Sequence, residues 1–266
     1  MNIGDVGAAL GPALLQGALV ALPRRNALGS LRRLRSPAWA AALPGCIVLG
    51  TFGPLGEPSF ALCMILAAAL ATPPLAVVGV LGVMRGPRAA LVALAVVAGT
   101  LATFASGVSG QLSASAVTAL GALAIGAGIA RLIPARWVLA GFVGMCAVDV
   151  ALLAAGVGQP AATIIGRAAL HVPGAVFDHA QVGRVVLDYP DLVLAAALGG
   201  FLAGQRGQLR AAALVTGLAA ISLILAPAHA VWPATVPVAM TLIALRTVGL
   251  PRAAELTSLL PEPAAP

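Results

Sequence analysis

The residues in this sequence that are the clearest candidates for a chemical function are two aspartates associated with long apolar segments. Asp149 lies near the middle of a run without other charges, Met-Cys-Ala-Val-Asp-Val-Ala at 145–151. An aspartate at mid-bilayer costs about 2.5–3.5 kcal/mol, so it is normally protonated, paired or functional. Asp191 opens a later apolar run, in Leu-Asp-Tyr-Pro-Asp-Leu at 187–192. Each also has a structural interpretation: Asp149 as a neutral acid bonded to a neighbouring helix, and Asp191 as part of a helix cap that begins at Asp188.

Taken together, the two aspartates predict aspartic-protease chemistry. They lie on consecutive apolar segments, so their side chains could face each other across a water-filled cleft. Two carboxyl groups about 3 Å apart cannot both ionise, and one of them keeps a proton. One carboxylate would then activate water while the other acid protonates the substrate carbonyl. This chemistry needs no cofactor and no metal, and we expect neither.

A third motif is Trp-Pro-Ala-Thr-Val-Pro at 232–237, at the start of the last apolar segment. Its two prolines free backbone groups that could line a cavity or bond an extended substrate. We therefore expect Pro233, Ala234 and Thr235 to bind substrate. The alternative is a simple helix start, where proline is common in the first turn.

Other residue types capable of chemistry give weaker patterns. His171, Asp178 and His179 lie in one polar stretch, but without the helical His-x-x-x-His spacing of a metal site, so we interpret them as part of a solvated, flexible loop. Cys46, Cys63 and Cys146 have no paired spacing that would indicate a disulfide framework or a zinc site. The sequence shows no phosphate-binding loop and no serine-histidine-aspartate arrangement.

The composition places the chain in a membrane. Of 266 residues, 61% are hydrophobic and 9% charged, and the mean hydropathy is +1.04. A soluble domain has roughly 25% charged residues, so this composition excludes an ordinary cytosolic enzyme and a disordered chain. The formal charge of +7 comes entirely from arginines, most of them between apolar runs, and aromatics are only 4%. That pattern favours membrane anchoring over nucleic-acid binding. An alanine- and arginine-rich composition is typical of high-GC bacteria.

The apolar runs predict an all-α integral membrane protein, a polytopic bundle of about nine transmembrane helices. A spanning helix needs about 20 mostly apolar residues. The expected spans are 6–22, 38–52, 59–83, 89–105, 114–130, 137–157, 189–204, 211–226 and 232–247. The third contains Pro73-Pro74 and is expected to be kinked or split. We treat 1–266 as a single transmembrane domain, with helices one to five in 1–135, catalytic helices six to nine in 136–250, and a flexible cytoplasmic tail at 251–266.

The arginines predict the orientation in the membrane. They follow the first, third, fifth, seventh and ninth spans, while the loops after the second, fourth and eighth contain none. By the positive-inside rule, the N-terminus lies outside and the C-terminus in the cytoplasm of a multi-pass cell-membrane protein. The long polar stretch 158–188 falls outside, with Arg167 and Arg184 balanced by Asp178 and Asp188. The first span follows Asp5 and no arginine, unlike a cleavable signal peptide.

The order of these motifs resembles the presenilin and signal peptide peptidase family of intramembrane aspartyl proteases of the Gly-x-Gly-Asp type. Those proteins have nine spans, with Tyr-Asp in the sixth, Gly-x-Gly-Asp in the seventh and Pro-Ala-Leu at the ninth. The corresponding residues here are Val148-Asp149, Asp188-Tyr189-Pro190-Asp191 and Pro233-Ala234-Thr235. Both motif glycines and the tyrosine are replaced, which marks a divergent bacterial member. The resemblance covers spans six to nine, and the first five match only in number.

The resemblance implies a function. Asp149 and Asp191 would be the catalytic pair, cleaving transmembrane helices of membrane proteins or signal peptides. The expected partners are therefore transmembrane helix substrates and the lipid bilayer, and no nucleic acid. The outside N-terminus resembles the signal peptide peptidase orientation, which implies type II substrate helices.

Three alternatives remain open at this point. The prepilin-peptidase type also uses Gly-x-Gly-Asp, and the run 195–199 after Asp191 resembles it, although its cytoplasmic site fits less well. A transporter or channel for a cation or small solute would use Asp149 as a relay, and the kinked third span and many glycines motivate it. A catalytically inactive membrane scaffold is motivated by the lost motif glycines.

Overall fold

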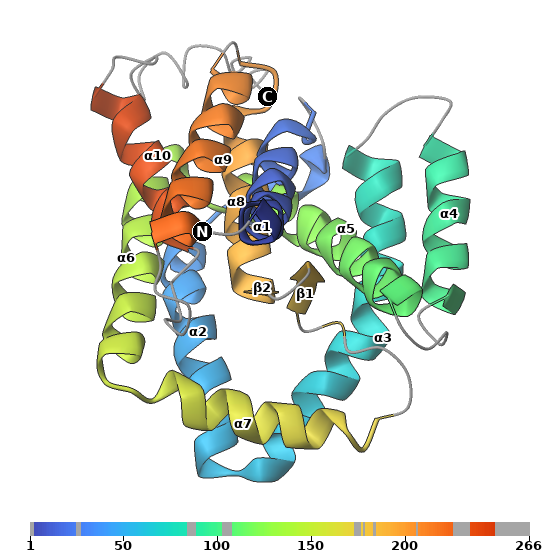
Figure 1. The fold of residues 1–266 in the computed structure, drawn as a ribbon. Coiled ribbons are helices and arrows are strands. Elements are labelled where there is room, and N and C mark those ends of the chain that lie inside the picture. The colour runs from blue at the N-terminus through green and yellow to red at the C-terminus, as the bar shows by residue number, and fades with distance from the viewer. Residues whose placement is uncertain are drawn as a thin grey trace.

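The computed structural model describes residues 3–24, 28–83, 89–102, 108–172, 177, 179–182, 185–205, 207–225 and 235–247. Within these ranges the chain is almost entirely helical, as predicted, with one added β-hairpin (Figure 1). The elements are α1 (Ile3–Ala21), η1 (Gly29–Leu34), α2 (Ala38–Gly56), α3 (Pro58–Val83), α4 (Ala89–Ala102), α5 (Val108–Leu132), α6 (Ala135–Ala154), α7 (Gly158–Ala169), β1 (His179–Val182), β2 (Val185–Asp188), α8 (Tyr189–Leu202), α9 (Gln208–Leu225) and α10 (Thr235–Thr247).

Each of the nine predicted spans corresponds to an apolar helix, but the helices differ in length. Four are long and apolar enough to cross a bilayer: α2, α3, Ser109–Leu132 of α5, and α6. The apolar parts of α1, α4, α8, α9 and α10 have 10–17 residues, less than the roughly 20 that a perpendicular span needs. Large apolar side chains are exposed on the outside, among them Leu49, Leu70 and Leu94, as is typical of helices that face lipid. Four of the described helices thus have the length and composition needed to cross a membrane, and the other five are apolar but shorter.

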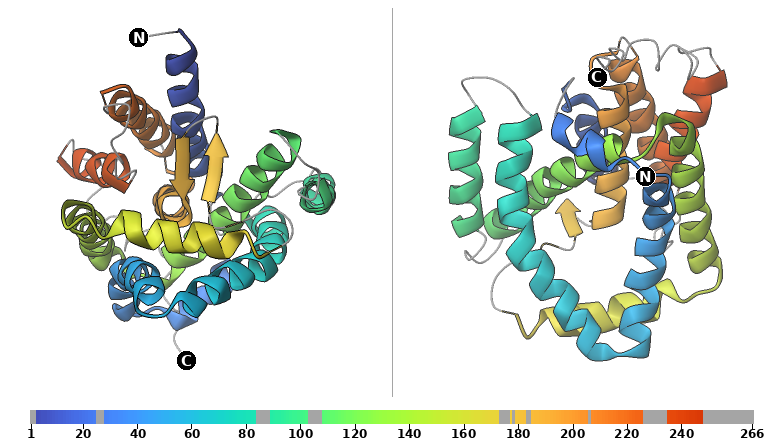
Figure 2. Two further views of the ribbon diagram at one scale, coloured as in Figure 1. Left: turned by 60° about the horizontal axis from the view of Figure 1, so that its bottom comes forward. Right: turned by 180° about the vertical axis from the view of Figure 1, so that it is seen from behind.

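The long helix α3 passes through Pro73 and Pro74 without ending. It bends along its course (Figures 1 and 2), as expected where prolines remove hydrogen bonds within a helix. The predicted third span is therefore one bent helix and is not split.

The short helix α8 forms the centre of the structure, and every residue from Asp191 to Gly200 is buried. It packs against α1, α5, α9 and α10. Glycines permit this close packing: a Cβ on Gly126 of α5 would lie 2.5 Å from Cβ of Ala196, and one on Gly199 would lie 2.5 Å from the Val20 carbonyl oxygen. Helices with small residues at their contacts approach closely in membranes. The second aspartate is therefore carried by the least exposed helix.

The stretch 158–188, predicted to be a flexible loop, contains two ordered elements. Helix α7 crosses one end of the molecule against α2 and α3 (Figure 2). Its apolar residues Ala161, Ile164, Ile165 and Ala168 repeat at helical spacing and form one face. Strands β1 and β2 form an antiparallel hairpin that pairs His179 with Asp188. The expectation was wrong because polar residues in this stretch obscured the amphipathic pattern.

Candidate active site

The first candidate aspartate is held by a neighbouring helix. Asp149 lies on α6, half-buried, and its Oδ2 accepts a 2.7 Å hydrogen bond from the hydroxyl of Thr235. Thr235 is the first residue of α10 and is fully buried. The residue expected to bind substrate therefore contacts a candidate catalytic group directly. Pro233 and Ala234, the other residues of that motif, lie outside the described residues.

The second candidate aspartate is fixed by the start of its own helix. Asp188 is the N-cap of α8, and its backbone N–H donates to Oδ2 of Asp191 at 3.2 Å. The Asp188 side chain reciprocally accepts from the backbone of Asp191, which completes a capping box with Pro190 in the first turn. The capping interpretation is thus confirmed. Capping holds the Asp191 carboxyl at the helix start, where the helix dipole favours an anion.

Helices α6 and α8 bring the two aspartates toward each other. The two helices contact each other through Phe142 of α6 and Phe201 of α8, whose ring centroids lie 5.9 Å apart in an edge-to-face arrangement. Asp149 follows Phe142 by two helical turns and so shares its face of α6. Helix α10 packs against both α6 and α8. The carboxyl groups of Asp149 and Asp188 both lie close enough to Asp191 to interact with it electrostatically.

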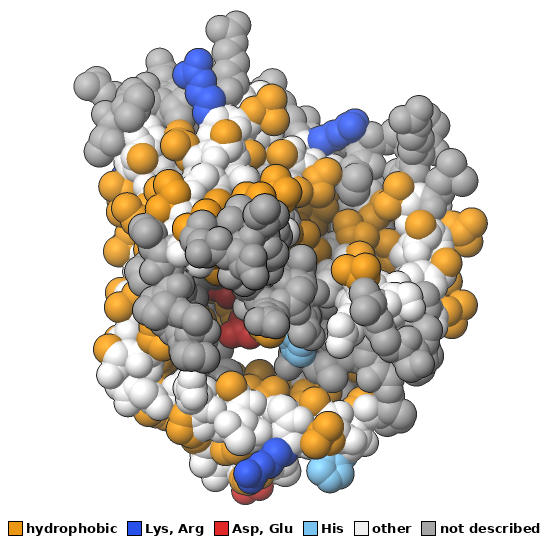
Figure 3. All heavy atoms as spheres, in the orientation of Figure 1, with side chains coloured by type: hydrophobic (Ala, Val, Ile, Leu, Met, Phe, Trp, Pro, Cys, Tyr) orange, Lys and Arg blue, Asp and Glu red, His pale blue; other side chains and the backbone are white. Residues whose placement is uncertain are grey.

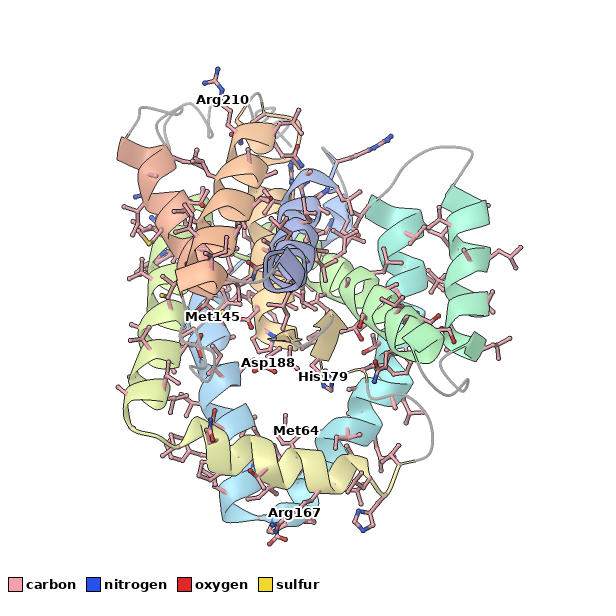
Figure 4. All side chains as sticks on the ribbon, in the orientation of Figure 1. Met64, Met145, Arg167, His179, Asp188 and Arg210 are labelled. Carbon is pink, nitrogen blue, oxygen red and sulfur yellow. The ribbon has the colours of Figure 1, made fainter. Side chains whose placement is uncertain are left out.

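This acidic group borders an opening in the molecule. Figure 3 shows acidic side chains at the rim of a hollow in the middle of the displayed face, with a histidine nearby. In Figure 4, Asp188 and His179 lie on one side of this space, and Met64 of α3 lies on the other. Asp188 is exposed, whereas Asp191, three residues further along the chain, is buried. Of the three aspartates, Asp188 is thus the one whose side chain is open to this hollow.

The remaining residues singled out in the sequence lie elsewhere or outside the described ranges. His171 is exposed just beyond the end of α7, with its Nδ1 3.0 Å from the carbonyl oxygen of Arg167. Arg167 points away from the hollow (Figure 4). Asp178 and Arg184 lie outside the described residues. Among the residues that the structure does describe, no three His, Cys, Asp or Glu side chains are grouped to hold a metal ion.

Two polar neighbours of the aspartates were not expected from the sequence. Cys146 lies one turn before Asp149 on α6, and its thiol interacts with both Thr235 and Asp149. Tyr189, the only tyrosine in the chain, places its hydroxyl in the interior, next to Gly121 of α5 and Thr72 of α3. The spacing of Cys146 three residues before Asp149 was the one available signal, since residues at i and i+3 share a helix face.

Comparisons of the chain with protein-family models, curated proteins and solved structures find no match.

Proposed function

We propose that this chain is an intramembrane aspartyl protease, a nine-span membrane protein of presenilin-like arrangement that cleaves transmembrane helices or signal peptides. The observation that carries the proposal is that Asp149, bonded to the buried Thr235, interacts electrostatically with Asp191 of a separate helix. Acids brought together in an apolar surrounding are typical of functional sites.

The geometry suggests a role for each residue. Water enters from the hollow beside Asp188 and is held between the carboxyl groups of Asp149 and Asp191. The ionised carboxylate removes a proton from water, whose oxygen then bonds to the peptide carbonyl carbon, while the protonated acid donates to the carbonyl oxygen. The C–N bond then breaks as the acid that received the proton from water donates it to the leaving amine, and a hydroxyl of the tetrahedral diol returns a proton to the other carboxylate as the new carboxyl group forms. Thr235 orients Asp149 through its hydrogen bond, and the backbone N–H of Asp188 orients Asp191.

The proposal also covers the location of the chain in the cell membrane and its orientation there. Arg210 and Arg167 lie at opposite ends of the molecule (Figure 4). The Arg210 end also carries most of the other arginines in the predicted topology, so it faces the cytoplasm of the cell membrane. The N-terminus is then outside and the C-terminus inside. The substrate would be a type II transmembrane helix.

The direct test uses a fluorescent reporter helix and the full-length chain in proteoliposomes. Asp149→Asn and Asp191→Asn should each abolish cleavage, while both variants still insert and keep the thermal unfolding midpoint of the parent within a few degrees. Glu57→Gln is a matched control, because Glu57 is an exposed acid at the start of α3 whose side chain bonds Ser59. Full cleavage by Asp191→Asn would refute the assignment.

A second test addresses the distance between the aspartates without an activity assay. Cys46, Cys63 and Cys146 are replaced by alanine, and Asp149→Cys and Asp191→Cys are then introduced together. A short bis-thiol crosslinker should join the pair within the chain. Asp149→Cys with Glu57→Cys should not react in this way. If neither pair is joined, the two side chains do not meet and the catalytic pair is wrong.

Transport of a cation or small solute is a second candidate. The buried hydroxyls Thr72, Thr118 and Tyr189 on α3, α5 and α8 favour it, because polar groups within a helix bundle can line a solute path. A transporter would show flux in proteoliposomes that depends on Asp149 and is independent of Asp191. If the proteoliposomes show no flux but cleave the reporter helix, the transport proposal is refuted and the protease proposal is supported.

A further inference from the structure

Three arginines from two separate segments gather at one end of α5. Arg32 lies in η1 and Arg35 directly after it, while Arg131 lies in the last turn of α5. Arg32 and Arg35 are exposed and Arg131 is half-buried. Each of the three interacts electrostatically with another: Arg131 with Arg32 and Arg35, and Arg35 with Arg32. Like charges repel, so the fold must hold them together.

The structure fixes η1 by apolar and backbone contacts. Leu28 packs on Gly82 of α3, where an added Cβ would lie 3.2 Å from its side chain, and Leu31 packs on Gly128 of α5, where an added Cβ would lie 3.5 Å from its side chain. Leu28 adopts a left-handed backbone conformation, with φ 51° and ψ 39°. That conformation is strained for a leucine and persists only where surrounding contacts impose it. The segment bearing Arg32 is therefore held in a defined position.

Arg35 is also attached to α5. Its Nε donates to the carbonyl oxygen of Ile133 at 3.3 Å, and the backbone N–H of the next residue, Ser36, donates to that of Leu132 at 3.0 Å. Although the residue as a whole is exposed, partial desolvation of its guanidinium group and the adjacent charge of Arg32 lower the pKa of Arg35. Neither segment 28–36 nor segment 108–136 contains an aspartate or glutamate. The two segments together thus form a positively charged, preorganised cluster.

Two tryptophans place this cluster at the depth of lipid headgroups. Trp39 and Trp137 lie in the first turns of the adjacent helices α2 and α6, and each is about two-fifths exposed. The indole N–H of Trp39 donates to the carbonyl oxygen of Leu34, the last residue of η1, at 3.1 Å. Tryptophans concentrate at the membrane–water interface. The arginines next to them would therefore meet phosphate groups of the membrane.

We propose that Arg32, Arg35 and Arg131 form a binding site for the phosphate group of an anionic phospholipid. Guanidinium groups bind phosphate oxygens through paired, charge-assisted hydrogen bonds, and basic clusters at helix ends select anionic lipids. The proposal rests on the membrane location inferred above and is independent of proteolysis. The bound phosphate offsets the repulsion among the three arginines.

The test measures binding of phosphatidylglycerol to the purified full-length chain in detergent micelles, with phosphatidylcholine as the neutral lipid. The parent should bind phosphatidylglycerol in preference to phosphatidylcholine. Arg35→Gln combined with Arg131→Gln should weaken phosphatidylglycerol binding at least tenfold. Arg210→Gln together with Arg246→Gln removes the same charge from α9 and α10 and should change binding less than twofold. Equal losses in the two double variants would show unspecific attraction and overturn the proposal.

Two further measurements test whether the paired donors of arginine are needed and whether the ligand is a lipid or free phosphate. Arg35→Lys with Arg131→Lys keeps the charge but removes the paired donors, so it should lose affinity even if the glutamine variant does not fold. Inorganic phosphate should displace the lipid only weakly. If phosphate alone binds as tightly as phosphatidylglycerol, the site is one for free phosphate and the lipid assignment is wrong. Reporter cleavage by the parent chain is measured separately, so failure of lipid binding is distinguishable from failure of the protease proposal.

Discussion

The hydroxyl of Thr235 donates a 2.7 Å hydrogen bond to Oδ2 of Asp149, from a residue 86 positions further along the chain. The bond joins the start of α10 to α6, next to the helix that carries Asp191. A charged aspartate in an apolar bundle requires such a donor, because an unsatisfied carboxylate in low dielectric is strongly disfavoured. The bond also restricts the rotation of the Asp149 carboxyl. Thr235 therefore positions a candidate catalytic group and is not limited to contacting substrate.

Replacing Thr235 tests this relationship. Thr235→Val keeps the shape of the side chain and removes the donor, and we expect kcat for reporter cleavage to fall about 10- to 100-fold with little change in KM, as for loss of a hydrogen bond to a charged group. Thr235→Ser keeps the hydroxyl and should retain most activity. Thr163→Val is the matched control, since Thr163 bonds only the Gln159 carbonyl of its own exposed helix. A Thr235→Val variant with parental kcat would contradict the positioning role.

The sequence was informative about the site where a local pattern determines the geometry. The capping box between Asp188 and Asp191 followed from their spacing and from Pro190, because it depends on neighbouring residues alone. The helical class and the nine apolar segments followed from composition and the length of each run. These features require no knowledge of which helices pack together.

The features that depend on packing were not predictable from the sequence. The bond between Thr235 and Asp149 depends on α10 lying beside α6, and no local pattern encodes that choice of neighbour. The complete burial of α8 is likewise a property of the surrounding helices, since its apolar residues would suit a lipid-facing helix equally well. The hairpin that opposes His179 to Asp188 was missed because each of its strands has only four residues, too few for a clear alternating pattern.

The cap of α8 gives a second prediction. Asp188→Ala removes the side chain that accepts from the Asp191 backbone, and we expect the chain to lose about 1 kcal/mol of stability. Asp188→Asn keeps an acceptor at the N-cap and should remain within about 0.5 kcal/mol of the parent. Chemical unfolding in mixed micelles measures both. If Asp188→Asn and Asp188→Ala lose the same stability, the charge of Asp188 matters and its capping bond does not.

The contact between α5 and α8 gives a third prediction. A Cβ on Gly126 would lie 2.5 Å from Cβ of Ala196 and 2.6 Å from the backbone nitrogen of Ala197, so Gly126→Ala must push the helices apart. We expect a loss of about 1–3 kcal/mol, as for overpacked cores. A Cβ on Gly217 of α9 would meet nothing within 4 Å, so Gly217→Ala should be neutral or stabilise the helix by about 1 kcal/mol. Thermal unfolding that ranks the two variants in the opposite order would refute the tight contact.

The buried side chain of Gln208 gives a fourth prediction. Its Nε2 lies within hydrogen-bonding distance of three carbonyl oxygens at the end of α1 and just beyond it, those of Val20 at 3.0 Å, Ala21 at 3.1 Å and Pro23 at 2.8 Å. Its Oε1 accepts from the backbone N–H of Gly204 at 3.1 Å. One amide thereby satisfies the end of the first helix and the turn after α8, where unpaired groups in a dry interior are costly.

We therefore expect Gln208→Leu, which fills the same space without polar atoms, to destabilise the chain by about 1–3 kcal/mol and to make the end of α1 susceptible to limited proteolysis. Gln205→Leu is the control, because Gln205 donates only to the Phe201 carbonyl one turn earlier, at 3.2 Å. It should change the unfolding free energy by less than about 0.5 kcal/mol, as surface substitutions usually do. If both variants unfold alike, the Gln208 side chain does not stabilise the end of α1, and the packing of α1 on α9 rests on other contacts, such as that of Gly17 with Ala212 and Thr216.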